Sequence, residues 1–176
     1  NERRYFAQQA MDEGHVSGGV CMALTYHDGE NLDAVVQDAK LGKRVRSWVE
    51  TSAKAGVTRA QYWLGRYNEA DVGGSGLPLV ERRKLSHKMF RMAAEKGHAS
   101  SMYELARHAF SAAKEAGSPQ SAAPLIEEGI RLMQGSADNR HRLAKDYVDT
   151  YLKRAMCPVL ESATCPVQVN APRPPN

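Results

Sequence analysis

The sequence predicts an all-α protein: one right-handed α/α solenoid of about four helical hairpins, with no β-sheet. Three observations support this fold. Glycines recur at nearly even intervals of 42, 41 and 38 residues, at Gly14, Gly56, Gly97 and Gly135. Residues of the same type follow these glycines at fixed distances along the chain. Segments with helical hydrophobic spacing lie on both sides of each glycine, as in proteins built from repeated hairpins.

Each glycine is expected to end one helix, because glycine adopts the left-handed cap conformation without a side-chain clash. Small residues then let the next helix approach closely, while a larger apolar residue fills the groove between the two helices. Four positions after each glycine the sequence has Gly18, Ala60, Ser101 and, as the exception, Asn139. Eight positions after each glycine it has Met22, Leu64, Leu105 and Leu143.

We expect helix pairs at residues 2–13 with 16–27, 40–55 with 58–70, 80–96 with 99–115, and 120–134 with 137–155. A single pair cannot bury its apolar stripe, so neighbouring pairs must stack on one another. The repeat domain is expected to span residues 1–156. Residues 157–176 contain five prolines and are expected to be extended rather than helical.

Two segments resemble the Sel1-like repeat, which is related to the tetratricopeptide repeat. Residues 53–67 read AKAGVTRAQYWLGRY, and residues 93–106 read AAEKGHASSMYELA. A unit of that family runs from an Ala-Ala-x-x-Gly turn into a helix of the form small-x-x-x-Leu-Gly-x-x-Tyr. The resemblance implies an α/α solenoid that holds other proteins. The chain differs from the family at residues 28–42 and 71–78, where longer loops are expected in place of a short Gly-rich connection.

Composition and charge exclude several classes of protein. The chain has 176 residues, of which 42% are hydrophobic and 25% charged, so it is neither disordered nor collagen-like. No apolar stretch approaches the roughly 20 residues that cross a bilayer. Basic clusters occur at residues 43–46, 82–84 and 140–142, with a net charge of +4. Because most aromatic residues fall at expected core positions, a continuous basic track with stacking aromatics is not expected, and an acidic protein surface is a better partner than nucleic acid.

No residue pattern indicates catalysis, a cofactor or a metal. Ser111 and Lys114 have the Ser-x-x-Lys spacing of penicillin-recognising enzymes, but the companion Lys-Thr-Gly is absent. A solvated helix end explains these two residues better. No two of the six histidines are four residues apart, the spacing that would put two metal ligands on one helix face. We therefore expect a non-enzymatic protein without metal or cofactor.

The cysteines suggest a compartment. Cys157 and Cys165 are each followed by Pro-Val and are separated by seven residues, so we prefer a disulfide to two free thiols. Cys21 lies in an apolar stretch and is expected to be a small buried side chain. A disulfide would place the mature protein outside a reducing cytosol, in a periplasm or otherwise exported. The chain begins at Asn1, so we expect either a trimmed sequence or a removed leader, which can also carry a lipid anchor.

A partner-binding face is expected on the first helices of the pairs, which line the concave surface in arrays of this type. On the helix at 80–96 the expected apolar stripe is Leu85, Met89, Met92 and Ala93. The opposite stripe is Arg83, His87 and Arg91. A shift by the 41-residue repeat maps His87 and Arg91 onto Arg46 and Glu50. These five polar residues form the predicted partner site, and a merely solvated polar face explains them about as well.

The family resemblance also implies a function. Small exported Sel1-like proteins of bacteria include periplasmic immunity proteins, which neutralise toxic effectors such as phospholipases delivered by type VI secretion. We expect this chain to be such an inhibitor, with a toxin of acidic surface as its partner. The alternative is an adaptor or scaffold for a cell-envelope or secretion complex.

Overall fold

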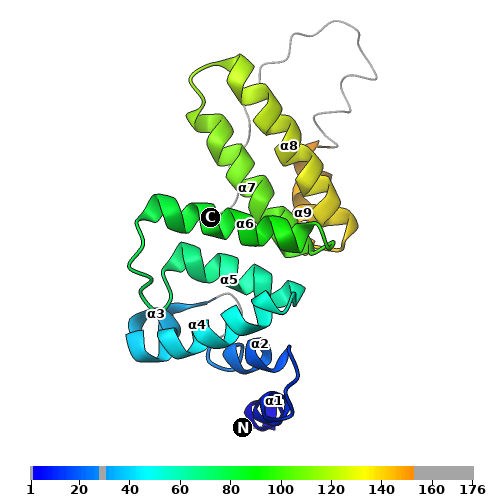
Figure 1. The fold of residues 1–176 in the computed structure, drawn as a ribbon. Coiled ribbons are helices and arrows are strands. Elements are labelled where there is room, and N and C mark those ends of the chain that lie inside the picture. The colour runs from blue at the N-terminus through cyan, green and yellow to red at the C-terminus, as the bar shows by residue number, and fades with distance from the viewer. Residues whose placement is uncertain (1, 28–30, 153–176) are drawn as a thin grey trace, which may run out of the picture. The chain divides into compact units, whose positions relative to one another are not determined.

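A computed structural model describes residues 2–27 and 31–152 of the chain, and Figure 1 shows its helices. Over these residues the protein is all-helical and contains no β-strand, which confirms the predicted all-α class. The elements in chain order are α1 (Glu2–Asp12), α2 (Gly18–Ala23), α3 (Asp33–Gln37), α4 (Ala39–Lys54), α5 (Thr58–Ala70), α6 (Leu79–Ala94), α7 (Ala99–Glu115), α8 (Pro119–Asp138), α9 (Arg142–Tyr147) and the π-helix η1 (Val148–Leu152).

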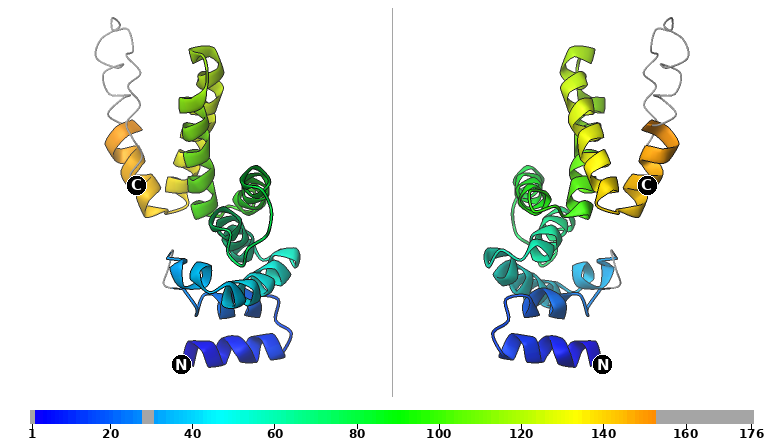
Figure 2. Two further views of the ribbon diagram at one scale, coloured as in Figure 1. Left: turned by 90° about the vertical axis from the view of Figure 1, so that its left-hand side faces the viewer. Right: turned by 90° about the vertical axis from the view of Figure 1, so that its right-hand side faces the viewer.

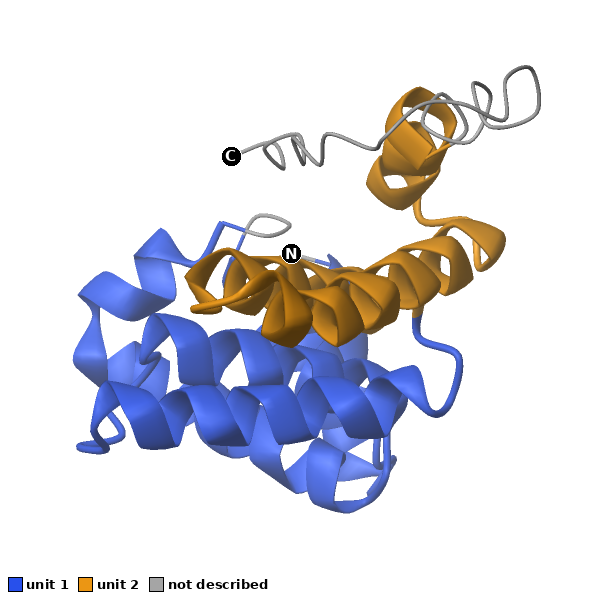
Figure 3. Cartoon of the chain, turned by 90° about the horizontal axis from the view of Figure 1, so that it is seen from above, with its two compact units in different colours: residues 1–98 blue, residues 99–176 orange. Residues whose placement is uncertain are grey.

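The chain divides into two compact units, Asn1–His98 and Ala99–Asn176, which Figure 3 shows in different colours. In the first unit α1 packs on α2, α2 on α4, α4 on α5 and α5 on α6. In the second unit α7 packs along α8, and Figure 2 shows these two helices side by side. The core of the second unit consists of Tyr103, Ala106, Met133, Ala144 and Val148.

Three turns have the glycine conformation that the sequence predicts. Gly14, Gly56 and Gly97 have φ values of 77°, 84° and 79°, in the left-handed region. After each glycine, the next backbone N–H donates to the carbonyl five residues earlier, as His98 does to Ala93 over 3.1 Å. This is the Schellman arrangement, which satisfies carbonyls that the end of a helix leaves without partners.

The fourth turn was predicted at Gly135, and this position is wrong. Gly135 lies inside α8, which continues to Asp138. The left-handed residue is Arg140, with φ 66°, and His141 N–H donates to the Ser136 carbonyl over 3.1 Å. Glycine is the residue type that usually marks such a turn in a sequence. The turn itself requires only a left-handed backbone, which an L-residue adopts at a cost of about 1–2 kcal/mol.

With Arg140 as the fourth turn, the repeat becomes more regular. The intervals between left-handed residues are then 42, 41 and 43 residues. Small residues stand four positions after every one of these turns, and all of them are buried: Gly18, Ala60, Ser101 and Ala144. The same turn, followed by a buried small residue, therefore recurs at these four positions. Asp71 ends α5 with the same hydrogen bond, from Val72 N–H to the Tyr67 carbonyl over 3.0 Å, but the residue four positions later, Ser75, is only half-buried.

Other helix boundaries differ from expectation in the first unit. The helix predicted at 16–27 is only α2, because Thr25 donates its hydroxyl to the Met22 carbonyl over 2.8 Å and the following N–H groups form tighter i→i+3 bonds. The loop predicted at 28–42 contains α3 and the start of α4. Asp38 begins α4 by accepting hydrogen bonds from Lys40 N–H and Leu41 N–H over 3.0 and 2.9 Å.

Glycines allow aromatic rings to pack directly on a neighbouring helix. A Cβ atom on Gly65 of α5 would lie 2.5 Å from the ring of Phe90 on α6, and one on Gly129 of α8 would lie equally close to Phe110 of α7. Each ring therefore occupies space that any larger residue would take. Cys21, which we predicted to be buried, is instead an exposed free thiol on α2.

Some predictions fall on residues that the structure does not describe. Cys157, Cys165 and the whole of 157–176 lie outside the described residues. Within the described part, none of the helices combines the length and the apolar character needed to cross a bilayer.

The placement of the fourth turn can be tested by substitution. Arg140→Gly should raise the free energy of unfolding by about 1 kcal/mol, because glycine relieves the left-handed strain. Gly97→Ala should lower it by about 1 kcal/mol. Gly135→Ala should be neutral or stabilising by up to about 1 kcal/mol, since it lies inside a helix. Urea unfolding followed by circular dichroism measures the free energy of unfolding of all three variants. A large loss of stability in Gly135→Ala would show that the turn lies at Gly135.

Candidate partner-binding surface

Helix α6 carries most of the predicted partner site, and its orientation is set by Phe90. Phe90 is fully buried against Gly65, together with Ser86 and Ala93 on the same side of α6. The predicted apolar stripe was therefore wrong except at Ala93. Leu85 is 37% exposed, and the two methionines of that stripe are half-buried. The missing side chain at Gly65 decides which of the adjacent residues, Met89 or Phe90, faces α5.

The structure places the three predicted residues of α6 at successive turns of one helix. Arg83 and Arg91 are exposed, and His87 is half-buried. Neither arginine forms an ion pair with any part of the chain that the structure describes. These two guanidinium groups can therefore meet a partner without first breaking an ion pair to the described residues.

The other two predicted residues, Arg46 and Glu50 on α4, are engaged within the first unit. Arg46 Nε donates to Glu50 Oε1 over 2.7 Å, and Nη2 donates to Asn68 Oδ1 over 2.6 Å. The remaining nitrogen, Nη1, donates to the Val72 carbonyl over 3.3 Å. Only 15% of the Arg46 side chain is exposed. Arg46 therefore holds α4 against the end of α5.

A second arginine caps the end of α5 from α6. Arg82 Nη1 donates to the carbonyls of Asn68 and Glu69 over 3.2 and 3.1 Å, where the helix leaves carbonyls without helical partners. Asp71 follows in the left-handed conformation, with φ 53°. Its carboxylate accepts the backbone N–H and the hydroxyl of Ser75 over 2.9 and 2.8 Å, and these hydrogen bonds hold the pKa of Asp71 below its ordinary value.

A buried histidine and tyrosine pair lies in the aromatic core of the first unit. His27 Nε2 and the Tyr67 hydroxyl are 3.0 Å apart and share one hydrogen bond. Burial raises the pKa of the Tyr67 phenol, so this group keeps its proton. The centroid of the Trp63 ring lies 4.5 Å from the centroid of the His27 ring and 6.2 Å from that of the Tyr67 ring. The pair thus packs as part of the core, and the sequence analysis did not identify it.

A polar cleft of about 970 Å³ lies in the first unit. It was missed by the sequence analysis because one wall is α3, which was expected to be loop. Arg4 stands over the Tyr26 ring at 4.3 Å and donates to the Thr25 carbonyl over 3.4 Å. Among the described residues, the lining also contains Arg3, Glu2 and Asp33, so both signs of charge are present in the cleft.

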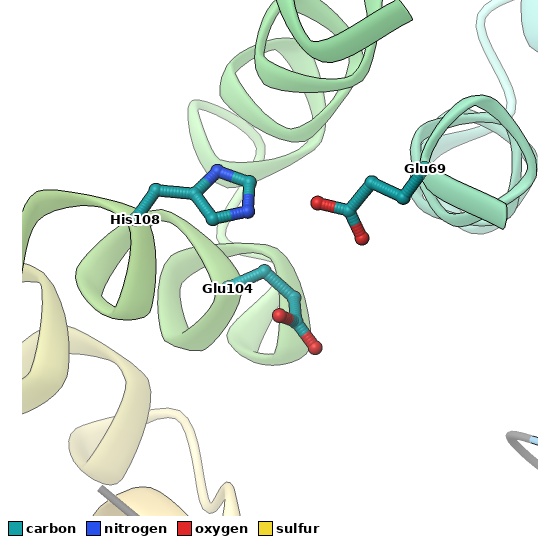
Figure 4. Close-up of side chains that lie close together, drawn as sticks. All are labelled: Glu69, Glu104 and His108. Carbon is teal, nitrogen blue, oxygen red and sulfur yellow. The ribbon is translucent and has the colours of Figure 1, made fainter. Parts of the chain in front are cut away.

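Helix α7 presents a carboxylate and an imidazole that the search for histidine pairs missed. Glu104 and His108 are one turn apart, and Figure 4 shows them on the same side of α7, with Glu69 of the first unit also drawn. Glu104 is buried and pairs with Arg107 over 3.0 Å, so its charge is already balanced. Two ligands on one helix do not complete a metal site. Ser111 and Lys114 are both exposed near the end of α7.

Comparison with known proteins identifies no relative, since no family model, curated protein or solved structure matches the chain. The resemblance of residues 53–67 and 93–106 to Sel1-like repeats therefore stays a prediction. The partner site likewise depends on the chemistry of the residues themselves.

The different roles of the arginines can be separated by stability measurements. Arg46→Ala should lower the free energy of unfolding by about 2 kcal/mol, because it removes three charge-assisted hydrogen bonds from a largely buried group. Arg91→Ala, at an exposed position of α6, should change it by less than about 0.5 kcal/mol. Urea unfolding of the two variants side by side provides the measurement. Equal losses would contradict the assignment of Arg46 to the packing of α4 on α5.

Proposed function

We propose that the chain is a non-enzymatic, protein-binding member of the Sel1-like type, a solenoid of about four helical hairpins. More specifically, we propose a periplasmic immunity protein that binds and inhibits a toxic, lipase-type secreted effector. The observation that carries the proposal is the repetition of one turn within the four predicted helix pairs. The left-handed residues of these turns, Gly14, Gly56, Gly97 and Arg140, lie 42, 41 and 43 residues apart, and each is followed by a buried small residue four positions later.

Repetition of this kind supports binding rather than catalysis. Arrays of hairpins bury their core between neighbours and leave extended surface, which such proteins use to hold other proteins. Enzymes instead gather titratable groups in a concave site with perturbed pKa values. The perturbed carboxyl group of Asp71 is used to close a turn, and the buried Tyr67 packs in an aromatic core. These local structural roles favour a binding protein.

The charged surface supports a protein partner with acidic groups. Arg83 and Arg91 are exposed on α6 and have no ion pair in the described structure. A planar guanidinium grips a carboxylate through two parallel hydrogen bonds, which suits recognition of an acidic protein surface. An inhibitor gains rapid association from such charge complementarity, which is useful against a toxin that must be captured quickly.

The proposal is tested with the protein encoded by the neighbouring open reading frame. We expect the purified chain to form a 1:1 complex with that toxin and to abolish its lipase activity at equimolar concentration. Deletion of the chain should be harmful only when the toxin reaches the periplasm. A toxin encoded elsewhere serves as the control. If no complex forms, and if deletion of the gene alters secretion or polysaccharide export, the immunity function is wrong and the adaptor function is favoured.

A further inference from the structure

Two helices carry a surplus of positive charge. Helix α6 contains five cationic side chains and a single carboxylate, a net charge of +4, and α4 has the same composition of charge. In α4, Arg46 is held by three hydrogen bonds and Arg44 lies over the Trp48 ring at 4.9 Å. In α6 a larger part of the charge faces solvent without such contacts.

Packing explains only part of this surplus. Arg82 is used at the end of α5, and Lys84 pairs with Glu81 over 2.9 Å. Arg83, Lys88 and Arg91 are exposed and form no ion pair with the residues that the structure describes. The helix dipole disfavours cations near the beginning of a helix and favours them in the last turn, where Arg91 lies. Ion pairing within the described residues therefore accounts for none of these three charges, and the helix dipole favours only Arg91.

The exposed side of α6 combines these charges with apolar residues. Val80, Lys84, Lys88 and Arg91 are spaced by four, four and three residues, which places them on one helix face, and we call them the α6 ridge. Val80 is 63% exposed. Beside it, Leu77 and Leu79 are 40% and 48% exposed, so three large apolar side chains meet solvent at the start of the helix.

We propose that the α6 ridge docks an acidic, amphipathic segment of the partner protein. This inference rests on the proposed function, because it takes the partner to be a protein. Carboxylates of that segment face Lys84, Lys88 and Arg91, and an apolar side chain covers Val80 and Leu79. Charge provides steering toward the ridge, whereas burial of the apolar end provides the anchor.

The composition of the ridge favours protein over the other anionic partners. Single-stranded nucleic acid is bound by aromatic side chains on which bases stack, and Phe90, the aromatic residue of α6, is buried. A helix that lies on a membrane presents a long apolar face beside its cations. In α6 the buried side faces α5, and the exposed apolar residues Leu79, Val80 and Leu85 do not lie on one helix face.

The first measurement uses a synthetic peptide of about five helical turns, with Glu on one face and Leu on the other. We expect fluorescence anisotropy to show binding to the full chain that weakens as salt rises. Lys88→Glu with Arg91→Glu should reduce the affinity by about tenfold, because attraction becomes repulsion. The matched control is Arg142→Glu with Lys145→Glu on α9, an exposed pair with the same spacing and the same change in charge, expected to stay within about twofold.

The apolar end is tested with a second matched pair. Val80→Ser should weaken binding of the peptide by about fivefold, because the anchor loses buried apolar area. The control, Val16→Ser, replaces another valine, which is 58% exposed in the turn before α2, and it should leave the affinity for the peptide unchanged. Circular dichroism and urea unfolding of all variants show that each remains folded.

Two further ligands and the toxin itself decide the outcome. Tighter binding to a single-stranded DNA oligonucleotide or to phosphatidylserine vesicles than to the peptide would overturn the proposal, as would equal losses in the α6 and α9 variants. A toxin complex that is unaffected by the α6 substitutions would also overturn it while leaving the immunity function intact. If the unaltered chain does not bind the toxin but the peptide affinities change as expected, the immunity function is wrong and the docking role of the α6 ridge is retained.

Discussion

The left-handed turn between consecutive helices is the constraint on which the rest of this structure depends. One residue with positive φ lets two backbone hydrogen bonds close the end of a helix and reverses the chain within a few residues. The helices that the turn joins pack on one another in the pairs α1–α2, α4–α5 and α8–α9, and Gly18 of α2 leaves no space for a side chain beside Met11 of α1. Glycine provides this conformation at three turns and Arg140 at the fourth, so the conserved feature of the repeat is the backbone geometry and not the residue type.

The sequence predicted those elements whose signals are local. Helices α5 and α7 have the bounds expected for 58–70 and 99–115, since glycine marks the turn before each of them. The end of α8 was predicted too early, because arginine is not a residue type that indicates a left-handed backbone. The short helix α3 was missed for another reason. It depends on Asn31, whose side chain accepts the Asp33 N–H, within a segment too brief for hydrophobic periodicity to be read.

The candidate site could be predicted as far as residue type and spacing decide it. The repeat places Arg46 at the position of His87, and it does not indicate that Arg46 is held by Asn68 and the Val72 carbonyl, because these contacts arise from tertiary packing. The face of α6 was misjudged by one residue because Met89 and Phe90 are both apolar, and the choice between them is made on α5, by the absence of a side chain at Gly65. The cationic surplus of α6 and the equal surplus of α4, by contrast, can be counted in the sequence directly.

Neighbouring arginines of α6 show why charge alone is a poor guide to binding. Arg82 meets two carbonyls at the end of α5, so its position near the start of α6 is compensated by the electrostatics of another helix end. Arg83 is the next residue, points to solvent, and has no such compensation in the described structure. A chain that needed only a stable α6 would gain from acidic residues there. Arg83, which lacks this compensation and lies near exposed apolar residues, is therefore among the cations from which we propose a contact with a partner.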